Sequence, residues 1–359
     1  MAPYSDSPYD RRNSAHLKEA ILNRRLTALG VAAAVLLTLA AACSDDDDGA
    51  ETPAPSVANP TAAPTRTGDD GATIAPFSEG PGEGPEPFGK IIFYSFRDGD
   101  QEIYIMDVDG SNQTNLTNDA GEDFEPDASP DGSQIVFVSD RDGQANIWVM
   151  NSDGSDVRKL SKGSSGNLSP RWSPDGEKIA FSRSGTITVM DTDGNNERVV
   201  FEPEPETTAG PCLGPGFVGG WSPDSRRITY YSASVARGIA EVCIIDEDGG
   251  NLEVIVSDGV NLHAEPVWSP DGRYLAYRSI RDGQHEIYVY DLETRTEVRV
   301  TDDPGIDTEP DWSPDGEWIA IASFRIGTNE DIFIMRKDGS DVRRLTDNEA
   351  MEKYPIWAP

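Results

Sequence analysis

One short motif recurs along the C-terminal part of this chain at an almost constant spacing. The motif Trp-Ser-Pro-Asp-Gly is intact at 172–176, 268–272 and 312–316, and altered copies stand at 128–132, 221–225 and 357–359. Its proline falls at positions 130, 174, 223, 270, 314 and 359, so successive copies lie 44 to 49 residues apart. A period in the mid-forties is typical of four-stranded propeller blades. The six copies therefore constrain the fold more than any other feature.

Each repeat contains runs of residues that favour strands. A first apolar run follows the motif, at 91–95, 135–139, 179–182, 228–232, 275–279 and 319–323. A second run follows it, and an Asp-Gly pair comes next in five repeats (109–110, 153–154, 193–194, 248–249 and 338–339). β-Branched and aromatic runs bounded by Gly and Asp indicate strands joined by tight turns. The sequence thus predicts an all-β fold.

These repeats resemble the TolB-like, or PD40, β-propeller repeat over residues 89–359. In that family the Pro-x-Trp-Ser-Pro strand is the innermost of its blade. The resemblance implies a six-bladed propeller in which the first repeat, starting at Gly89, lacks its innermost strand. Residues 354–357 would supply that strand and pair with 91–94, because closure of the ring removes exposed sheet edges.

The resemblance has one departure. The family member TolB has an α/β domain ahead of its propeller, whereas only an acidic segment precedes the repeats here. The Tol–Pal partnership is therefore not carried over to this chain.

The N-terminus has the pattern of an export signal. Residues 1–25 are polar with five basic residues, and 26–42 form an apolar run of 17 residues that ends in alanines. This arrangement is typical of a secretory signal peptide, predicted at 1–42. The alternative is a transmembrane helix, which needs about 20 residues. Arg24-Arg25 also resembles a twin-Arg signal, although Thr27 and Ala28 replace its usual large apolar residues.

Cys43 follows the run in the sequence Ala-Ala-Ala-Cys-Ser, which resembles a relaxed bacterial lipobox. The resemblance implies that Cys43 becomes a lipidated N-terminus, held outside the cytoplasmic membrane, since two acyl chains anchor a protein stably. The alternative is cleavage after Ala-x-Ala with Cys43 unmodified. Residues 43–88 contain ten acidic residues and one basic residue, so we expect a disordered tether between the lipid and the propeller domain at 89–359.

The net charge bears on the partner of the protein, and the cysteines bear on a possible disulfide. Lys and Arg number 30 against 64 Asp and Glu, giving a net charge of -34, which argues against nucleic acid as a partner. Cys212 and Cys243 fall in one repeat, and export favours a disulfide between them. The alternative is a buried free Cys243 with an exposed Cys212.

Catalytic signatures are scarce. Neither Gly-x-Ser-x-Gly nor His-Glu-x-x-His occurs, so we expect a binding protein and not an enzyme. The alternative is a metal-dependent lactonase or esterase that uses the central channel. Asp-x-Asp-Gly at 107–110 and 191–194 lacks the distal ligands of a calcium loop and indicates turns.

The candidate site is a ring of polar residues just before the innermost strands. Its members precede the strand proline by three residues or by one: Asp123, Glu125, Asn167, His263, Glu265, Asp307, Glu309 and Glu352. Arginines of the neighbouring turns recur beside them: Arg97, Arg141, Arg281 and Arg325. We expect them at the channel mouth, where carboxylates could hold calcium or meet a basic peptide of an envelope protein. The alternatives are a solvated acidic face and structural Arg–carboxylate pairs.

Overall fold

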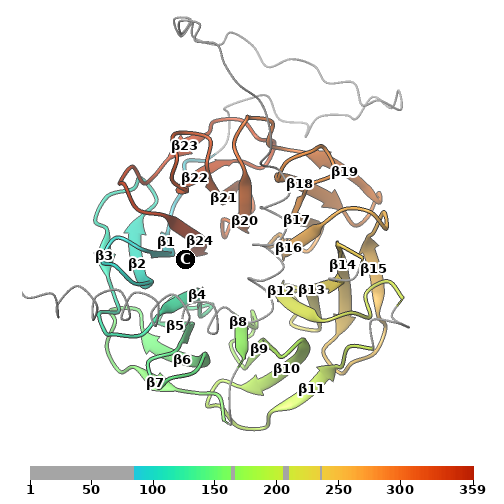
Figure 1. The fold of residues 1–359 in the computed structure, drawn as a ribbon, viewed down its shortest axis with the longest axis horizontal. Coiled ribbons are helices and arrows are strands. Elements are labelled where there is room, and N and C mark those ends of the chain that lie inside the picture. The colour runs from blue at the N-terminus through green and yellow to red at the C-terminus, as the bar shows by residue number, and fades with distance from the viewer. Residues whose placement is uncertain (1–84, 163–165, 205–209, 235–236) are drawn as a thin grey trace, which may run out of the picture. The chain divides into compact units, whose positions relative to one another are not determined.

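The computed structural model describes residues 85–359 except 163–165, 205–209 and 235–236. These residues form 24 strands in six antiparallel sheets of four strands and no helix. The sheets stand like blades around a central axis (Figure 1). The chain is thus a six-bladed β-propeller, as its repeats predict.

The blades are numbered along the chain, with the innermost strand given first. Blade 1 is β24 (Glu352–Ala358), β1 (Lys90–Ser95), β2 (Glu102–Asp107) and β3 (Thr114–Asn115), and blade 2 is β4 (Asp123–Ala128), β5 (Gln134–Ser139), β6 (Asn146–Asn151) and β7 (Arg158–Lys159). Blade 3 is β8 (Asn167–Trp172), β9 (Lys178–Arg183), β10 (Thr186–Asp191) and β11 (Arg198–Phe201).

The second half of the ring follows the same order. Blade 4 is β12 (Gly216–Trp221), β13 (Arg227–Ser234), β14 (Ile239–Asp246) and β15 (Glu253–Val256), and blade 5 is β16 (His263–Trp268), β17 (Tyr274–Ser279), β18 (Glu286–Asp291) and β19 (Thr296–Arg299). Blade 6 is β20 (Asp307–Trp312), β21 (Trp318–Ser323), β22 (Asp331–Arg336) and β23 (Arg343–Arg344).

The predicted closure of the ring is confirmed. The C-terminal strand β24 pairs antiparallel with β1, and Ile92 lies opposite Ile356 in this register. Blade 1 is therefore assembled from both ends of the propeller sequence.

The second and third strands are buried on both faces because each sheet packs between two neighbouring blades. All six residues of β21 are buried, and so are all six of β22. This explains why these runs are almost continuously apolar instead of alternating. The outermost strands β3, β7 and β23 have only two residues each.

The recurring motif forms tight turns. In blade 2 the backbone N–H of Gly132 donates to the Ser129 carbonyl, and the Asp131 carboxylate accepts from Ser129 and Ser133. Gly132 has φ +69°, which favours glycine. The Ser-Pro-Asp-Gly motif is therefore a structural turn that links the first and second strands of a blade.

The predicted signal peptide, Cys43 and most of the tether lie outside the described residues. Within the part that the structure describes, no helix has the length and apolar content needed to cross a membrane.

Candidate channel-mouth binding site

One end of the channel gathers every residue of the predicted ring. It is formed by the loops that lead into the innermost strands and by the turns between second and third strands, and we call it the mouth. Asp123 lies opposite Ser139 in blade 2, Asp307 opposite Ser323 in blade 6, and Glu352 opposite Ser95 in blade 1. In blades 2, 6 and 1 the repeat thus places the acidic residue of the innermost strand opposite the last serine of the second strand, at the mouth.

Three of these carboxylates are held by an arginine of their own blade. Arg97 binds Glu352 through two contacts of 2.7 Å, Arg141 Nη2 lies 2.8 Å from Asp123, and Arg325 Nη2 lies 2.9 Å from Asp307. We call these pairs clamps. The carboxylates are fully buried, so each clamp joins the turn to the innermost strand and does not present a free charge.

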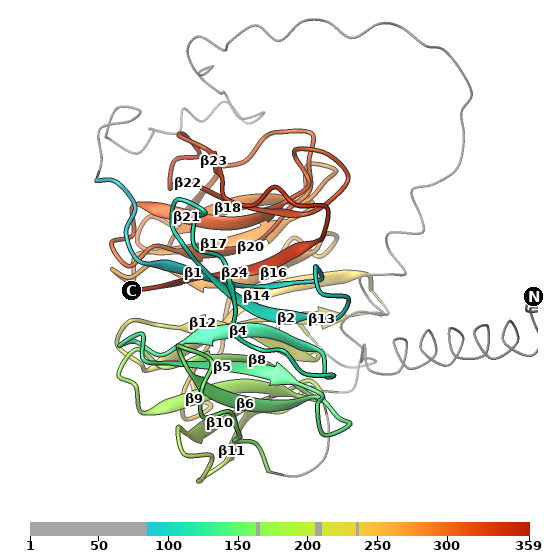
Figure 2. The same cartoon turned by 90° about the vertical axis from the view of Figure 1, so that its left-hand side faces the viewer.

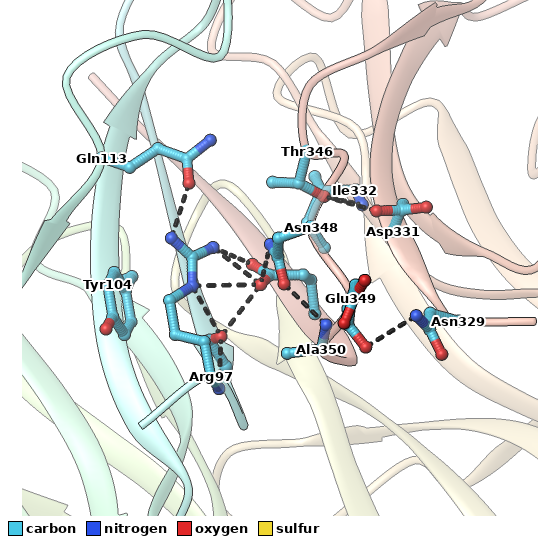
Figure 3. Close-up of polar contacts among 12 residues, drawn as sticks. Arg97, Tyr104, Gln113, Asn329, Asp331, Ile332, Thr346, Asn348, Glu349 and Ala350 are labelled. Atoms are coloured by element: carbon cyan, nitrogen blue, oxygen red, sulfur yellow. Dashed lines mark hydrogen bonds and ion pairs between the residues drawn. The ribbon is translucent and has the colours of Figure 1, made fainter. Parts of the chain in front are cut away.

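Figure 3 shows the blade 1 clamp, where the Arg97 guanidinium also donates to Gln113 at 2.8 Å and lies against Tyr104. The same stacking recurs, with a third-strand aromatic ring under the guanidinium in four blades: Arg97 on Tyr104, Arg141 on Trp148, Arg281 on Tyr288 and Arg325 on Phe333. Each of these arginines also donates Nε to the Ser two residues before it. The sequence analysis missed the aromatic partners, although they recur at a fixed position in the second run.

Blades 3 and 5 carry altered versions of the clamp. In blade 3 the neutral Asn167 accepts from Arg183 at 2.7 Å, and Arg183 was not among the predicted residues. In blade 5 His263 replaces the carboxylate and its Nε2 lies 3.3 Å from Asp258. Arg281 accordingly pairs with Glu297 and Tyr277 instead.

Burial alters the acidity of the clamp carboxylates. It raises the pKa of Asp123 and of Asp307 to about 6 in each case, against the opposing effect of their arginines. The pKa of Glu352 is raised for the same reason. Within the described residues, Asp123 Oδ1 and Asp307 Oδ2 are buried without a hydrogen-bond partner. A carboxyl oxygen without a donor is where a proton can reside as the pH falls.

The carboxylates one residue before the strand proline join neighbouring blades. Glu125 accepts the backbone N–H of Ser169 at 2.5 Å, Glu265 that of Glu309 at 2.8 Å, and Glu309 that of Tyr354 at 2.6 Å. All five residues adopt φ between 49° and 58°, at bulges of the innermost strands. The bulge turns each side chain toward the next blade, so these acidic residues hold the ring together.

Titratable side chains that are buried or half-buried lie beside these carboxylates in blades 5, 6 and 1. Arg278 pairs with Glu265 at 2.9 Å and contacts the His285 ring at 2.5 Å. Burial, with Arg278 nearby, lowers the pKa of His285 to about 4, so this ring is neutral at pH 7. Lys353 pairs with Glu330 at 2.8 Å.

The channel is crossed by a residue that the sequence analysis missed. Arg171 on β8 donates to the Gly219 carbonyl of blade 4 at 2.7 Å and to the Tyr354 hydroxyl of blade 1 at 2.7 Å. Asp127 and Asp311, one residue after the strand proline, accept the backbone N–H groups of Trp172 and Trp357. The recurrence of an aspartate directly after the strand proline in blades 2 and 6 was the available signal for Asp127 and Asp311.

The structure separates the predicted ring into pairs. Among the described residues, no group of three or more His, Cys, Asp or Glu side chains is placed so that it could hold a metal ion. Calcium at the mouth stays a prediction, and thermal unfolding with and without added calcium would test it.

Cys212 and Cys243 lie within bonding distance in blade 4. Their Sγ atoms are 2.00 Å apart and their Cα atoms 5.9 Å apart, and both side chains are fully buried. The Cys212 N–H also donates to buried Glu241, and the Tyr230 hydroxyl donates to the Cys212 carbonyl. These contacts fasten the long loop before β12 onto β14.

Large apolar side chains are exposed around one half of the mouth. Phe96, Val260, Ile306 and Ile326 are 37%, 72%, 39% and 50% exposed. They belong to blades 1, 5 and 6, which are consecutive in the ring (Figure 1). We call these four residues the apolar rim.

Residues 71–186 and 183–359 match the family model described as PD40, TolB beta propeller domain. The chain belongs to this family. Over 121 residues it is 34% identical to the Tol-Pal system protein TolB of Anaeromyxobacter dehalogenans (strain 2CP-C), and the match covers 34% of this chain and 27% of that protein. Over 70 residues it is 40% identical to the Tol-Pal system protein TolB of Xylella fastidiosa (strain M12), covering 19% of this chain and 16% of that protein. The chain therefore matches about a quarter or less of the length of these curated relatives.

Solved structures agree on the fold. TolB from Acinetobacter baumannii superposes with a TM-score of 0.65 at 21% identity, covering 77% of this chain and 68% of that one. A putative TolB from Agrobacterium tumefaciens superposes with a TM-score of 0.58 at 20% identity, covering 77% of this chain and 100% of that one.

Proposed function

We propose that this chain is an exported envelope lipoprotein whose propeller binds a protein or peptide at the channel mouth. The apolar rim carries the proposal, because exposed apolar side chains gathered at one end of a molecule mark interaction sites. The clamp arginines are engaged inside their own blades, so the exposed side chains of the apolar rim supply the contact surface.

The rim is distinct from the other exposed apolar residues. Val157, Leu252 and Val342 each follow an Asp-Gly turn at the same place in their repeats, so they are part of the blade pattern. Val199 and Val254 lie on the outermost strands β11 and β15. Ile326 stands where the turns of three other blades have an aspartate (Asp98, Asp142 and Asp282), so it departs from the repeat. The exposure of all four rim side chains at one end of the propeller supports a surface that binds a partner.

Acidic residues surround the rim and indicate the partner's charge. Exposed acids stand in the same loops of blades 5, 6 and 1: Asp258, Asp282, Asp302, Asp347, Glu349 and Asp98. A segment with basic and apolar side chains would complement this surface, and its association should weaken as salt rises.

The cellular location follows from two lines of support. The N-terminal sequence has the signal pattern with Cys43 at its end, and the curated relatives are Tol-Pal system proteins. We propose that Cys43 is lipidated and that the anchored propeller meets its partner outside the cytoplasmic membrane.

Capture from envelope extracts tests the binding function. The variant Val260→Asp/Ile326→Asp should lose the partner that the unchanged chain retains, whereas the matched variant Val199→Asp/Val254→Asp should retain it. Equal capture by both variants would contradict a site at the mouth. Turnover of lactones or esters by the metal-supplemented chain would instead favour the enzyme alternative.

A further inference from the structure

Blade 6 differs from the others at the end of the propeller opposite the mouth. The third strand ends in Asp or Asn in five blades, at Asp107, Asn151, Asp191, Asp246 and Asp291, but in Arg336 in blade 6. The second strand begins there with Trp318, where the other blades have Lys90, Gln134, Lys178, Arg227 and Tyr274. We therefore expect Trp318 or Arg336 to contact a part of the chain that lies outside the repeats.

The Trp318 indole is fully buried and is contacted by two guanidinium groups. Arg336 is 4.1 Å and Arg343 is 4.6 Å from the ring centroid. Cation–π contacts of this kind favour a planar, electron-rich ring held in one orientation.

The segment just before β1 contacts the Trp318 indole. The Pro85 carbonyl accepts the Trp318 indole N–H at 3.1 Å, and the Phe88 carbonyl accepts the Trp357 indole N–H at 2.7 Å. Glu86 pairs with Arg343 at 2.8 Å. Gly89 has φ +95°, and a Cβ there would lie 2.3 Å from the Ala358 carbonyl oxygen, so only glycine allows the chain to turn onto β24 at this point.

The hydrogen bonds from Trp318 and Trp357 to the segment 85–88 are not a general feature of the tryptophans in this fold. The indole nitrogens of Trp148, Trp172, Trp268 and Trp312 are buried without a hydrogen-bond partner among the described residues. Trp318 and Trp357 are the two whose donors are met by residues 85–88. A buried donor without an acceptor costs about 1–3 kcal/mol, so these two hydrogen bonds stabilise the docked position of residues 85–88.

We propose that residues 85–88 form a strap that docks on the Trp318–Arg343 surface and fixes where the upstream chain leaves the propeller. Trp318 stands at the start of β21 and Ser323, opposite Asp307 at the mouth, stands at its end. Figure 2 shows the start of β1 and the C-terminus at the same end of the blades. The strap therefore places Pro85, where the described chain begins, at the end opposite the mouth. The docking is independent of the proposed function.

Indole signals in NMR spectra of the full chain test the docking. In Arg343→Glu, repulsion from Glu86 should loosen the strap and raise the hydrogen-exchange rate of the Trp318 and Trp357 indoles about 2- to 5-fold, as the loss of an exposed ion pair implies. The Trp221 indole, which donates to the Arg171 carbonyl, is the internal control. The swapped variant Glu86→Arg/Arg343→Glu should restore both rates. Unchanged Trp318 and Trp357 signals in Arg343→Glu would overturn the strap.

Spin-label distances test the exit point without a partner, so their failure is separable from failure of the proposed function. In a Cys43→Ser background, a label at position 83 is paired with a label at 338, beside the strap, or at 326, at the mouth. The 83–338 distance should be shorter by about 15 Å, roughly the length of a six-residue strand. Equal distances to both positions would overturn the proposed exit point.

Discussion

Blades 2 and 4 hold their innermost strands by different means. Blade 2 uses a buried charge clamp between Arg141 and Asp123. Blade 4 has Gly216 at the place of that carboxylate and fastens its long loop with the Cys212–Cys243 pair and a close backbone contact at Gly219. The propeller therefore tolerates loss of the clamp where covalent and steric constraints take its place.

The comparison also separates residues by role. Residues that recur with the repeat, such as the clamp arginines, are engaged inside the fold. Residues that interrupt the repeat, such as Ile326 of the apolar rim and Trp318, are those with a role beyond the single blade. The predictions below test this separation.

The close backbone contact in blade 4 should give the largest effect. A Cβ at Gly219 would lie 2.0 Å from the Pro266 carbonyl oxygen, whereas one at Gly220 would lie 3.9 Å from its nearest neighbour. Gly219→Ala should lower the free energy of unfolding by at least about 3 kcal/mol, because backbone cannot move aside cheaply. Gly220→Ala is the matched control and should cost about 1 kcal/mol or less. Denaturant unfolding measures both, and equal losses would show that the contact is not tight.

The disulfide comes next. Cys212→Ser/Cys243→Ser should lower the free energy of unfolding by about 2–4 kcal/mol, since the bond closes a loop over a sequence separation of 31 residues. Intact mass before and after reduction, with thiol alkylation, establishes whether the bond forms. Two thiols that react without reductant would contradict it.

The clamp in blade 2 should depend on charge. Arg141→Met leaves Asp123 buried without its cation and should cost about 2 kcal/mol at pH 8. Because burial raises the pKa of Asp123 to about 6, the carboxyl takes up a proton by pH 5 and the cost should shrink. Arg183→Met in blade 3 is the control, since Asn167 is neutral and should show no such pH dependence at that contact. A cost for Arg141→Met that is the same at both pH values would contradict a charge clamp.

The whole protein should show a smaller pH effect of defined sign. Burial raises the pKa of Asp127 to about 6 and of Asp311 and Glu309 to about 7, so the folded state binds these protons more tightly than the unfolded state. The stability they contribute is complete below about pH 4 and is lost as the pH rises through 6 and 7. Two histidines act in the opposite direction, because burial lowers the pKa of His285 to about 4 and also lowers that of His263, but they are fewer than the buried carboxyl groups.

Melting temperature at pH 5 should therefore exceed that at pH 8, by roughly 5 °C for about 2 kcal/mol. Asp311→Asn keeps an acceptor for the backbone N–H of Trp357 and removes one titrating group, so it should reduce the difference in melting temperature between pH 5 and pH 8. A melting temperature that rises from pH 5 to pH 8 would contradict the raised pKa values.

The sequence predicted the architecture well because a propeller blade repeats its signals. The motif proline, the Asp-Gly turns and residues 354–357 were sufficient to assign six blades and the closure by β24. The positions of Asp123, Asp307 and Glu352 at the mouth also followed from the repeat.

Pairing was harder to predict than position. A carboxylate three residues before the strand proline could face the axis or its own turn, and only the paired strand register places Arg141 beside Asp123. Arg171 was missed because it occurs once, at a position where other blades have Asp127, Asp311 and smaller residues. The strap was missed because two of its contacts use backbone carbonyls, which carry no side-chain signal, and its ion pair joins Glu86 and Arg343, which lie far apart in the sequence.

Photo-crosslinking in intact cells tests the central claim most directly, that the apolar rim faces the partner. A crosslinking amino acid at position 260, 306 or 326 should join the chain to one envelope protein or peptide, and the same residue at 199 or 254 on the outer strands should not. A partner crosslinked equally from both sets, or only from the outer strands, would contradict the proposed channel-mouth site.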